Sequence, residues 1–104
     1  MKAIIEGKRY NTETATEVAD FSNNYPSNDF HYYEESLYQT KAGNWFLQGE
    51  GGGLSKYAVP VGNNGSGGGS RIIPLSPAEA KAWLEQAQHL LVAEQYFGAE
   101  IQDA

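Results

Sequence analysis

The sequence predicts an α+β fold: a small antiparallel β-sheet of about four to five short strands, a C-terminal helix packed on one face, and a short N-terminal helix. Residues 30–50 are rich in aromatic and other strand-favouring side chains. Residues 76–98 show helical periodicity behind a strong start signal. With 104 residues in all, we expect a single domain spanning residues 1–104.

The N-terminal part of the chain is predicted to form a hairpin followed by a helix. Residues 2–10 (KAIIEGKRY) favour two short strands around a turn at Gly7-Lys8. Between residues 11 and 21, Ala15, Val18 and Ala19 fall on one face at helical spacing. Thr14 with Glu17 three residues later is typical of a capping box, and residues 22–29 have the composition of a loop.

Residues 30–50 carry the strongest strand signal and predict the central hairpin. Aromatic and aliphatic side chains dominate both halves of the segment, and the KAGN sequence at 41–44 between them favours a tight turn.

The segment after this hairpin is rich in glycine. Residues 62–70 (GNNGSGGGS) resemble a flexible linker, and we predict a flexible loop there. Both a natural mobile loop and an engineered insertion fit this composition. A further short strand is predicted around Ile72 and Ile73, with Pro74 at a sheet edge or a strand end because proline has no N–H to donate.

The C-terminal segment predicts the longest helix. Ser76 fits the N-cap, Pro77 the first helical position and Glu79 the third, which closes a capping box. An apolar stripe follows at helical spacing: Ala80, Trp83, Leu84, Ala87 and Leu91. Gly98 fits the position after the helix end. The sequence leaves open whether the helix breaks near His89.

Charge and composition narrow the classes of function. The net charge is −6, and residues 76–104 hold five acids against Lys81 alone. Direct nucleic-acid binding is disfavoured, because phosphate contacts need a surface of lysine and arginine. Cysteine is absent, which fits a reducing cytoplasm. Because no long apolar run occurs, we expect neither a signal peptide nor a membrane span.

The stretch LQGEGGGLSK at 47–56 needs a separate test, because glycines before a lysine are typical of phosphate-binding loops. Counting from Gly49, the pattern demands glycine at 54, where the chain has Leu54, and Lys56 is followed by Tyr57 rather than Ser or Thr. Glu50 would also place negative charge beside a phosphate. We therefore predict a turn or bulge that uses positive φ at glycine, and no cofactor.

No catalytic or metal-binding constellation is evident, so we expect the protein not to be an enzyme. His31 and His89 lie in no recognisable motif, and His89 has no partner histidine four residues on. His31 is expected to pack against aromatic rings. Glu34 and Glu35 are adjacent on a predicted strand, so they point to opposite faces and cannot form an acid–base pair.

Tyrosines mixed with acids suggest a surface for a protein partner. The candidate partner-binding residues are Asp29, Tyr32, Glu34, Glu35, Tyr38 and Glu50. Tyrosine gives a large contact area at little entropic cost, and carboxylates favour a lysine- or arginine-rich partner. The alternative is structural: alternate aromatic side chains fill the core and the others shelter the sheet face.

Three segments together resemble a family of small acidic phage and mobile-element proteins. They are Tyr10 to Ala15 within GKRYNTETATEVA, Leu37 to Gly52 within LYQTKAGNWFLQGEGG, and Ile73 to Ser76 within SRIIPLSPAEAKAWLE. The resemblance covers about half of the chain. The long NNGSGGGS segment departs from the family pattern.

The resemblance implies a context but transfers no catalytic residue. Small acidic phage proteins of this kind resemble anti-CRISPR proteins, which implies an inhibitor that binds a basic nucleic-acid-binding surface of a bacterial Cas complex in the cytoplasm of the infected host. It would block DNA binding or nuclease recruitment. A general interaction module or regulator of a mobile element is the alternative, and a small nucleotide-binding protein or enzyme is a third. The target system and the oligomeric state are left open.

Overall fold

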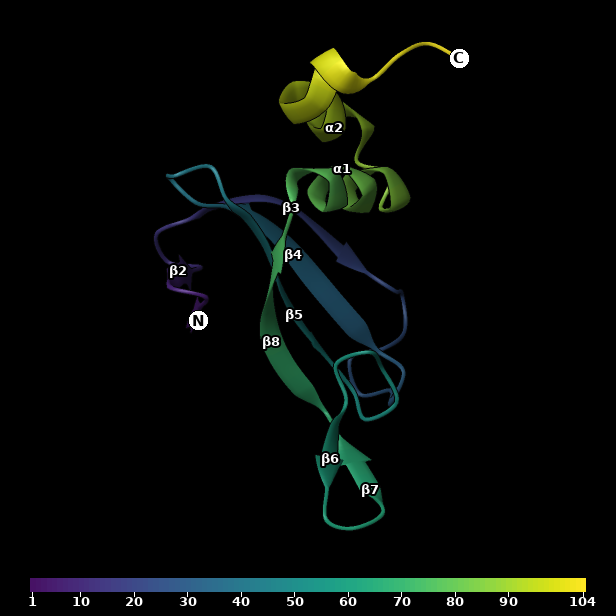
Figure 1. Cartoon of the computed structure of the whole chain (residues 1–104). Helices are drawn as coiled ribbons and strands as arrows, with labels where there is room; N and C mark the ends of the chain where they lie inside the picture. The colour runs from purple at the N-terminus through teal and green to yellow at the C-terminus, as the bar shows by residue number, and fades with distance from the viewer.

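Four antiparallel strands form the central sheet in the computed structural model, which describes residues 1–104 (Figure 1). Their order is β3–β4–β5–β8, so β4 and β5 are inner strands and the other two are edges. Their bounds are Thr16–Ser22 for β3, Tyr33–Gln39 for β4, Trp45–Gly51 for β5 and Gly69–Leu75 for β8. The predicted α+β class and the central hairpin are confirmed.

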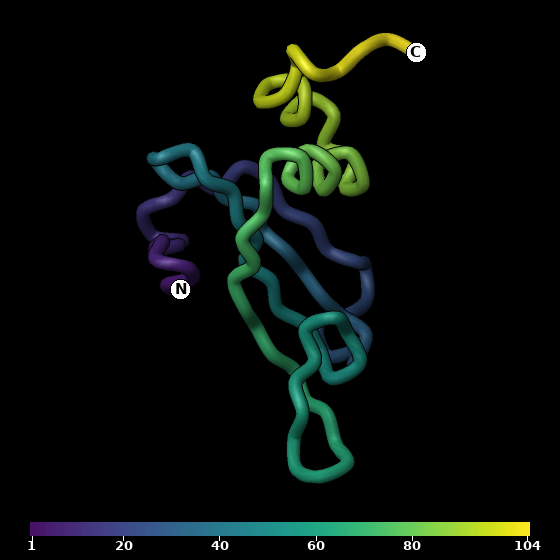
Figure 2. Tube along the Cα trace, in the orientation of Figure 1, coloured from purple at the N-terminus to yellow at the C-terminus, as the bar shows by residue number.

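Two small hairpins and two helices complete the fold. The hairpins pair β1 (Lys2–Ile5) with β2 (Lys8–Asn11), and β6 (Val59–Val61) with β7 (Gly65–Gly67). The helices are α1 (Pro77–Gln86) and α2 (Leu90–Phe97), followed by a 3₁₀ turn at Gly98–Glu100. Neither helix has the length and hydropathy needed to cross a membrane. Figure 2 shows that the β6–β7 hairpin projects from the end of the sheet opposite the helices.

Three consecutive residues of β5 divide the apolar core between the two faces of the sheet. Trp45 and Leu47 point toward the helices and pack with Leu84 of α1 and Phe97 of α2. Phe46 points the other way and packs with Tyr10 of the β1–β2 hairpin, edge to face at a ring-centroid distance of 5.4 Å. One end of the sheet is therefore covered on both faces, since side chains alternate along a strand. The other end carries the polar residues of β4 and β5.

The N-terminal hairpin is confirmed, with its turn one residue earlier than predicted. Ile5 pairs with Lys8, so Glu6 and Gly7 form a two-residue loop, and both have positive φ, 51° and 79°. This is the turn that matches the twist of two antiparallel strands. Pro74 lies in β8, an edge strand of the sheet. A residue without an N–H is tolerated there, because an edge strand has a neighbour on one side only.

The helix predicted over residues 11–21 is wrong, because residues 16–22 form the edge strand β3. The β3–β4 register shifts between Glu17 and Ala19, as in a β-bulge. The bulge interrupts the alternation, so that Val18 and Ala19 both pack against the helix-side core. Two adjacent apolar residues on one side mimic helical spacing in the sequence. Thr14 does not cap a helix; its N–H bonds to the carbonyl of Asn11 in a turn.

The glycine-rich segment 62–70 is built partly into strands. Residues 65–67 form β7 and residues 69–70 begin β8, so only the turn at 62–64 and Gly68 lie outside a strand. Gly62 has a φ of 66°, which suits the β6–β7 turn. The glycines of this segment therefore lie mainly in strands, including the projecting β6–β7 hairpin, and not in a loop without secondary structure.

The start of α1 follows the predicted capping box. The N–H of Glu79 donates to Ser76 Oγ at 3.1 Å, and the N–H of Ser76 donates to Glu79 Oε1 at 2.8 Å. The predicted stripe is correct for Ala80 and Leu84, which are buried, and wrong for Leu91, which is 83% exposed. Leu91 turns outward because the helix breaks at residues 87–89 and resumes as α2 in a new direction (Figure 1).

Gln88, rather than Gly98, takes the left-handed position at a helix end. The N–H of Gln88 donates to the carbonyl of Glu85, and that of His89 donates to the carbonyl of Leu84. These two bonds form a Schellman motif, whose residue after the cap is usually glycine. Gln88 has a φ of 61°, whereas Gly98 has a right-handed φ of −56°. A side chain with a Cβ is thus held in a strained backbone conformation.

We predict that Gln88→Gly stabilises the protein by about 0.5–1 kcal/mol, because glycine has no Cβ to oppose positive φ. Urea unfolding followed by circular dichroism measures the change. Gln95→Gly, at an exposed site inside α2, is the matched control and should destabilise by about 1 kcal/mol. Equal destabilisation by both substitutions would show that the strain at Gln88 is absent.

Candidate functional site

The carboxylate of Glu35 is buried at the polar end of the sheet. Glu35 lies in the middle of β4 on the helix side, and it is only 3% exposed. A buried charge is costly unless it is paired and hydrogen-bonded. The surroundings of Glu35 therefore have to provide donors.

Three side chains from two other parts of the chain donate to this carboxylate. The indole Nε1 of Trp83 in α1 donates to Oε1 at 2.9 Å. The Tyr57 hydroxyl donates to Oε2 at 2.5 Å, and Lys56 Nζ lies 2.9 Å from the same oxygen. Since Lys56 and Tyr57 belong to the turns at 52–58, the carboxylate joins the sheet, the helix and this segment. No buried side-chain polar atom lacks a partner.

The donors determine the protonation of the Glu35 site. Burial alone would raise the pKa of the Glu35 carboxyl, but the hydrogen bonds from Tyr57, Trp83 and Lys56 outweigh it and hold that pKa below its usual value. Burial and the neighbouring Glu35 charge raise the pKa of the Tyr57 hydroxyl well above its usual range. At neutral pH the site therefore holds an ionised carboxylate and a neutral tyrosine.

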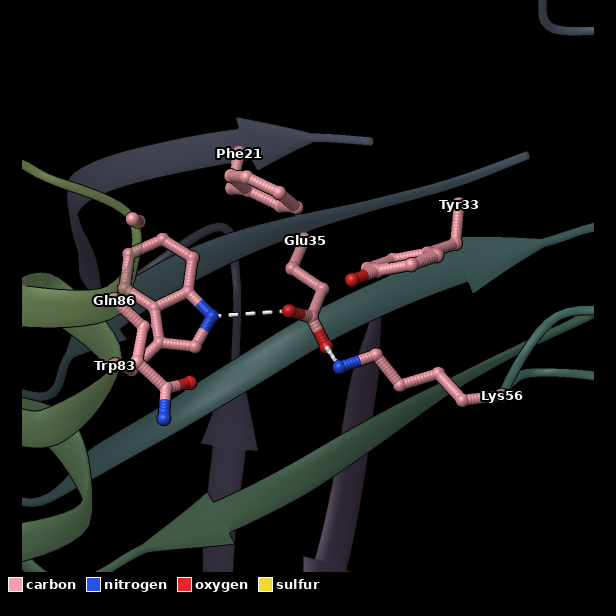
Figure 3. A pocket seen from close by; sticks show the side chains of 7 residues that line it. Phe21, Tyr33, Glu35, Lys56, Trp83 and Gln86 are labelled. Carbon is pink, nitrogen blue, oxygen red and sulfur yellow. Dashed lines mark hydrogen bonds and ion pairs between the residues drawn. The ribbon is translucent and has the colours of Figure 1, made fainter. Parts of the chain in front are cut away.

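A small pocket opens beside the Glu35 carboxylate (Figure 3). Its volume is about 100 Å³. Phe21 of β3, Tyr33 of β4 and Trp83 of α1 contribute aromatic rings to its wall, and Lys56 closes one side. The side chain of Lys56 is half-exposed, which makes it the group at the mouth of the pocket.

Gly49 explains part of the glycine-rich stretch at 47–56. It pairs with Glu35 across the β4–β5 ladder, and the ring of Tyr57 crosses over it to reach the carboxylate. A Cβ at position 49 would lie 2.0 Å from the Tyr57 ring. The predicted positive φ is wrong for this stretch: Gly49 and Gly51 belong to β5, and the left-handed glycines are Gly7, Gly43 and Gly62. The glycines are needed for close approach.

Residues after β5 do not provide the context of a phosphate-binding loop. Such a loop leads from a strand into the start of a helix, whereas residues 52–58 form turns that lead into β6. The N–H of Gly52 donates to the carbonyl of Tyr32 instead of remaining free for an anion.

The opposite face of the same strands is acidic. One row of cross-strand partners on this face consists of Ser22, Glu34, Glu50 and Ser70. The next row on the same face begins with Asp20 and Ser36. Glu17 stands nearer the covered end, where it accepts a 3.2 Å hydrogen bond from the Tyr38 hydroxyl. We call Glu17, Asp20, Glu34 and Glu50 the acidic sheet face. The apolar core on this side ends at Tyr38, Phe46 and Ile72, so the β1–β2 hairpin covers only the far end.

Glu34 and Glu50 face each other directly across the β4–β5 ladder. The interaction between the two carboxyl groups raises the pKa of Glu50 and lowers that of Glu34. The Tyr32 hydroxyl donates to Glu34 Oε2 at 2.5 Å, which also favours the ionised Glu34. Two carboxylates directly opposite on neighbouring strands destabilise the sheet unless a cation faces them.

The structure brings together three of the six candidate partner-binding residues. Tyr32, Glu34 and Glu50 lie side by side on the acidic sheet face, and Tyr38 stands at its covered end, stacked on Phe46. Asp29 lies apart in the turn before β4, where it accepts a hydrogen bond from the His31 N–H. Glu35 points to the other face, as the strand alternation predicts. Its buried network was missed, because nothing in the sequence links Glu35 with Trp83.

The histidines occupy structural positions. The ring of His31 packs 5.6 Å from that of Tyr25, so packing against an aromatic ring is confirmed. His89 stacks on Trp83 at 6.0 Å and contacts the carbonyl of Asp20 through Nε2, which ties the α1–α2 break to β3. No group of three or more acidic or histidine side chains is arranged to hold a metal ion.

Comparison with known proteins gave no match to a family model, to a curated protein or to a solved structure.

We predict that Glu35→Gln destabilises the protein by about 1–3 kcal/mol at pH 7, because the amide leaves buried donors poorly satisfied. The folded-state pKa of Glu35 is lowered, so its contribution is present above the unfolded pKa of about 4.3 and is lost as the pH falls through the folded value. Urea unfolding between pH 7 and pH 3 should show the gap between the two proteins closing. Glu94→Gln on α2 is the control, and a gap independent of pH would contradict the prediction.

A second substitution tests the close approach at position 49. We predict that Gly49→Ala costs about 2 kcal/mol or more, since the Tyr57 ring must move from the carboxylate. Thermal unfolding measures the loss, and near-ultraviolet circular dichroism reports the tyrosine environment. At Gly98 a Cβ would meet nothing within 4 Å, so Gly98→Ala should leave stability unchanged or slightly higher. Similar results for the two variants would exclude a packing role for Gly49.

Proposed function

We propose that this protein acts by stoichiometric binding to another protein, with the acidic sheet face contacting a basic surface of that partner. The observation that carries the proposal is the cross-strand pair of Glu34 and Glu50 on an otherwise uncovered half of the sheet. A cation between these carboxylates would relieve their repulsion. Lysine and arginine side chains of a partner supply such cations.

The composition of the acidic sheet face agrees with binding rather than chemistry. Two rows of residues run across the strands on this face, and neither contains a lysine or arginine. The rows are Ser22, Glu34, Glu50, Ser70 and Asp20, Ser36, Gln48, Ile72. The negative charge is therefore not neutralised within the face. Its field would attract a positively charged surface and accelerate association with it.

The partner we propose is a nucleic-acid-binding surface of a bacterial Cas complex, because three segments of the sequence resemble small phage proteins of the anti-CRISPR kind. The protein would then be a phage-encoded inhibitor of CRISPR immunity. The charge of this face suits surfaces that hold a DNA or RNA backbone. The inhibitor would block DNA binding or nuclease recruitment by occupying the surface. We favour steric blocking over full imitation of duplex DNA. A net charge of −6 is small beside one charge per roughly 1.7 Å of duplex.

The target class is tested by plaque assays. Hosts carrying different CRISPR types are infected with and without expression of this protein, and we expect plating to be restored in one type. Specific capture of a protein from a host that lacks CRISPR, with no restored plating, would instead support a general interaction module of a mobile element. A thermal shift with nucleotides or divalent metals would favour a nucleotide-binding protein or an enzyme.

The binding surface is tested by charge reversal. We predict that the double substitution Glu34→Lys and Glu50→Lys weakens binding to the captured partner at least about tenfold at moderate salt, because like charges then face each other. Binding is measured by calorimetry with the purified pair. The matched control, Glu94→Lys with Glu100→Lys, makes the same charge change on α2 and the 3₁₀ turn. Equal losses in both proteins would mean that net charge, and not this face, is recognised.

A further inference from the structure

The pocket beside Glu35 has the composition of an ammonium-binding site. The carboxylate supplies the negative charge, and the rings of Phe21, Tyr33 and Trp83 stand around it on three different elements (Figure 3). Aromatic faces attract cations through their quadrupole, and rings grouped around a cation form the cages that recognise ammonium groups. A carboxylate beside such rings adds direct charge pairing in partly desolvated surroundings.

The pocket already holds one ammonium group, that of Lys56. Its Nζ lies 2.9 Å from Glu35 Oε2 and 4.7 Å from the centroid of the Tyr33 ring. The aromatic ring and the carboxylate therefore act on the same cation. Lys56 reaches this position from the turns at 52–58, and its side chain is 49% exposed. A half-exposed stem that belongs to no helix or strand can move away without breaking the sheet ladder.

We propose that the Glu35 pocket binds the side-chain ammonium of a lysine on the protein partner, which takes the place of Lys56. In the free protein Lys56 occupies the site and keeps Glu35 paired. In the complex the partner's lysine takes over the contact with Oε2 and the Tyr33 ring, and Lys56 turns to solvent.

The remaining hydrogen bonds of Glu35 favour lysine over other cations. Oε1 faces the indole N–H of Trp83, so the open approach leads to Oε2 alone. An ammonium group can donate one N–H to Oε2 alone, whereas a guanidinium group donates best to both carboxylate oxygens at once. A trimethylammonium group has no N–H and would leave Oε2 with the Tyr57 hydroxyl as its single donor. The free volume of about 100 Å³ beside Lys56 adds to the space that Lys56 itself would vacate.

The position of the pocket connects it with the acidic sheet face. Phe21 and Glu35 also border the groove along β3 that contains Glu17, Asp20 and Glu34. The groove and the pocket lie on opposite faces of the sheet, so a partner that covers the groove reaches the Glu35 pocket by extending around the edge strand β3. The identity of the partner rests on the proposed function, but the chemistry of the pocket is measurable without any partner.

The test is a titration of Lys56→Ala with Nα-acetyl-lysine methylamide, which carries a free side-chain ammonium on a neutral backbone. The Trp83 indole N–H, which donates to Glu35, is observed by ¹H–¹⁵N NMR. We expect a saturable shift in Lys56→Ala, with affinity at least about tenfold higher than in the wild type, where the tethered Lys56 competes at a millimolar effective concentration. The same probe acetylated on its side chain should cause no shift, because it has no charge.

Matched variants complete the test. Lys41→Ala removes an exposed lysine from the β4–β5 turn and should behave as the wild type. Adding Glu35→Gln to Lys56→Ala should abolish the shift. Lys56→Gln repeats the measurement if Lys56→Ala does not fold. No saturable shift in the folded variant, an equal shift with the acetylated probe, or tighter binding of Nα-acetyl-arginine methylamide than of the lysine probe would overturn the inference. The proposed function fails on different evidence, namely partner binding that survives charge reversal at Glu34 and Glu50.

Discussion

The need to pair one buried carboxylate organises the polar half of this protein. Glu35 is buried on the inner strand β4, and its charge is supported by donors that lie 21, 22 and 48 positions away in the chain, at Lys56, Tyr57 and Trp83. A buried acceptor that loses its donors costs about 1–3 kcal/mol, and more when it is charged. The carboxylate therefore holds the 52–58 segment and α1 in place, although the hydrophobic core lies at the other end of the sheet.

This requirement also accounts for the composition of β5. Trp45, Phe46 and Leu47 fill both cores, and the strand then changes to glycine where Tyr57 has to cross it. A side chain at position 49 would separate the Tyr57 hydroxyl from Glu35, which is the cross-strand neighbour of Gly49. The same strand thus serves apolar packing at one end and a hydrogen-bonded polar site at the other.

The two faces of the polar end present carboxylates in opposite ways. On the helix side a single carboxylate is enclosed by donors and aromatic rings, and Lys56 balances its charge. On the other side Glu34 and Glu50 stand opposite each other with no cation in their rows. Removing a donor from the first arrangement would destabilise the fold, whereas the like charges of the second destabilise it as they stand. A stability cost retained at the surface is reasonable where binding to a cationic partner recovers it.

The sequence by itself determined those features that depend on neighbouring residues: the central hairpin around 41–44, the capping box of Ser76 and Glu79, and the opposite directions of Glu34 and Glu35. It failed at β3, where a bulge placed Val18 and Ala19 on one side and imitated helical spacing. It also failed at the Glu35 site, whose donors come from distant segments. Periodicity and capping act within a few residues, so the sequence displays them directly. The burial of a charge and the choice of its partners depend on how distant segments pack, and only the tertiary structure decided these.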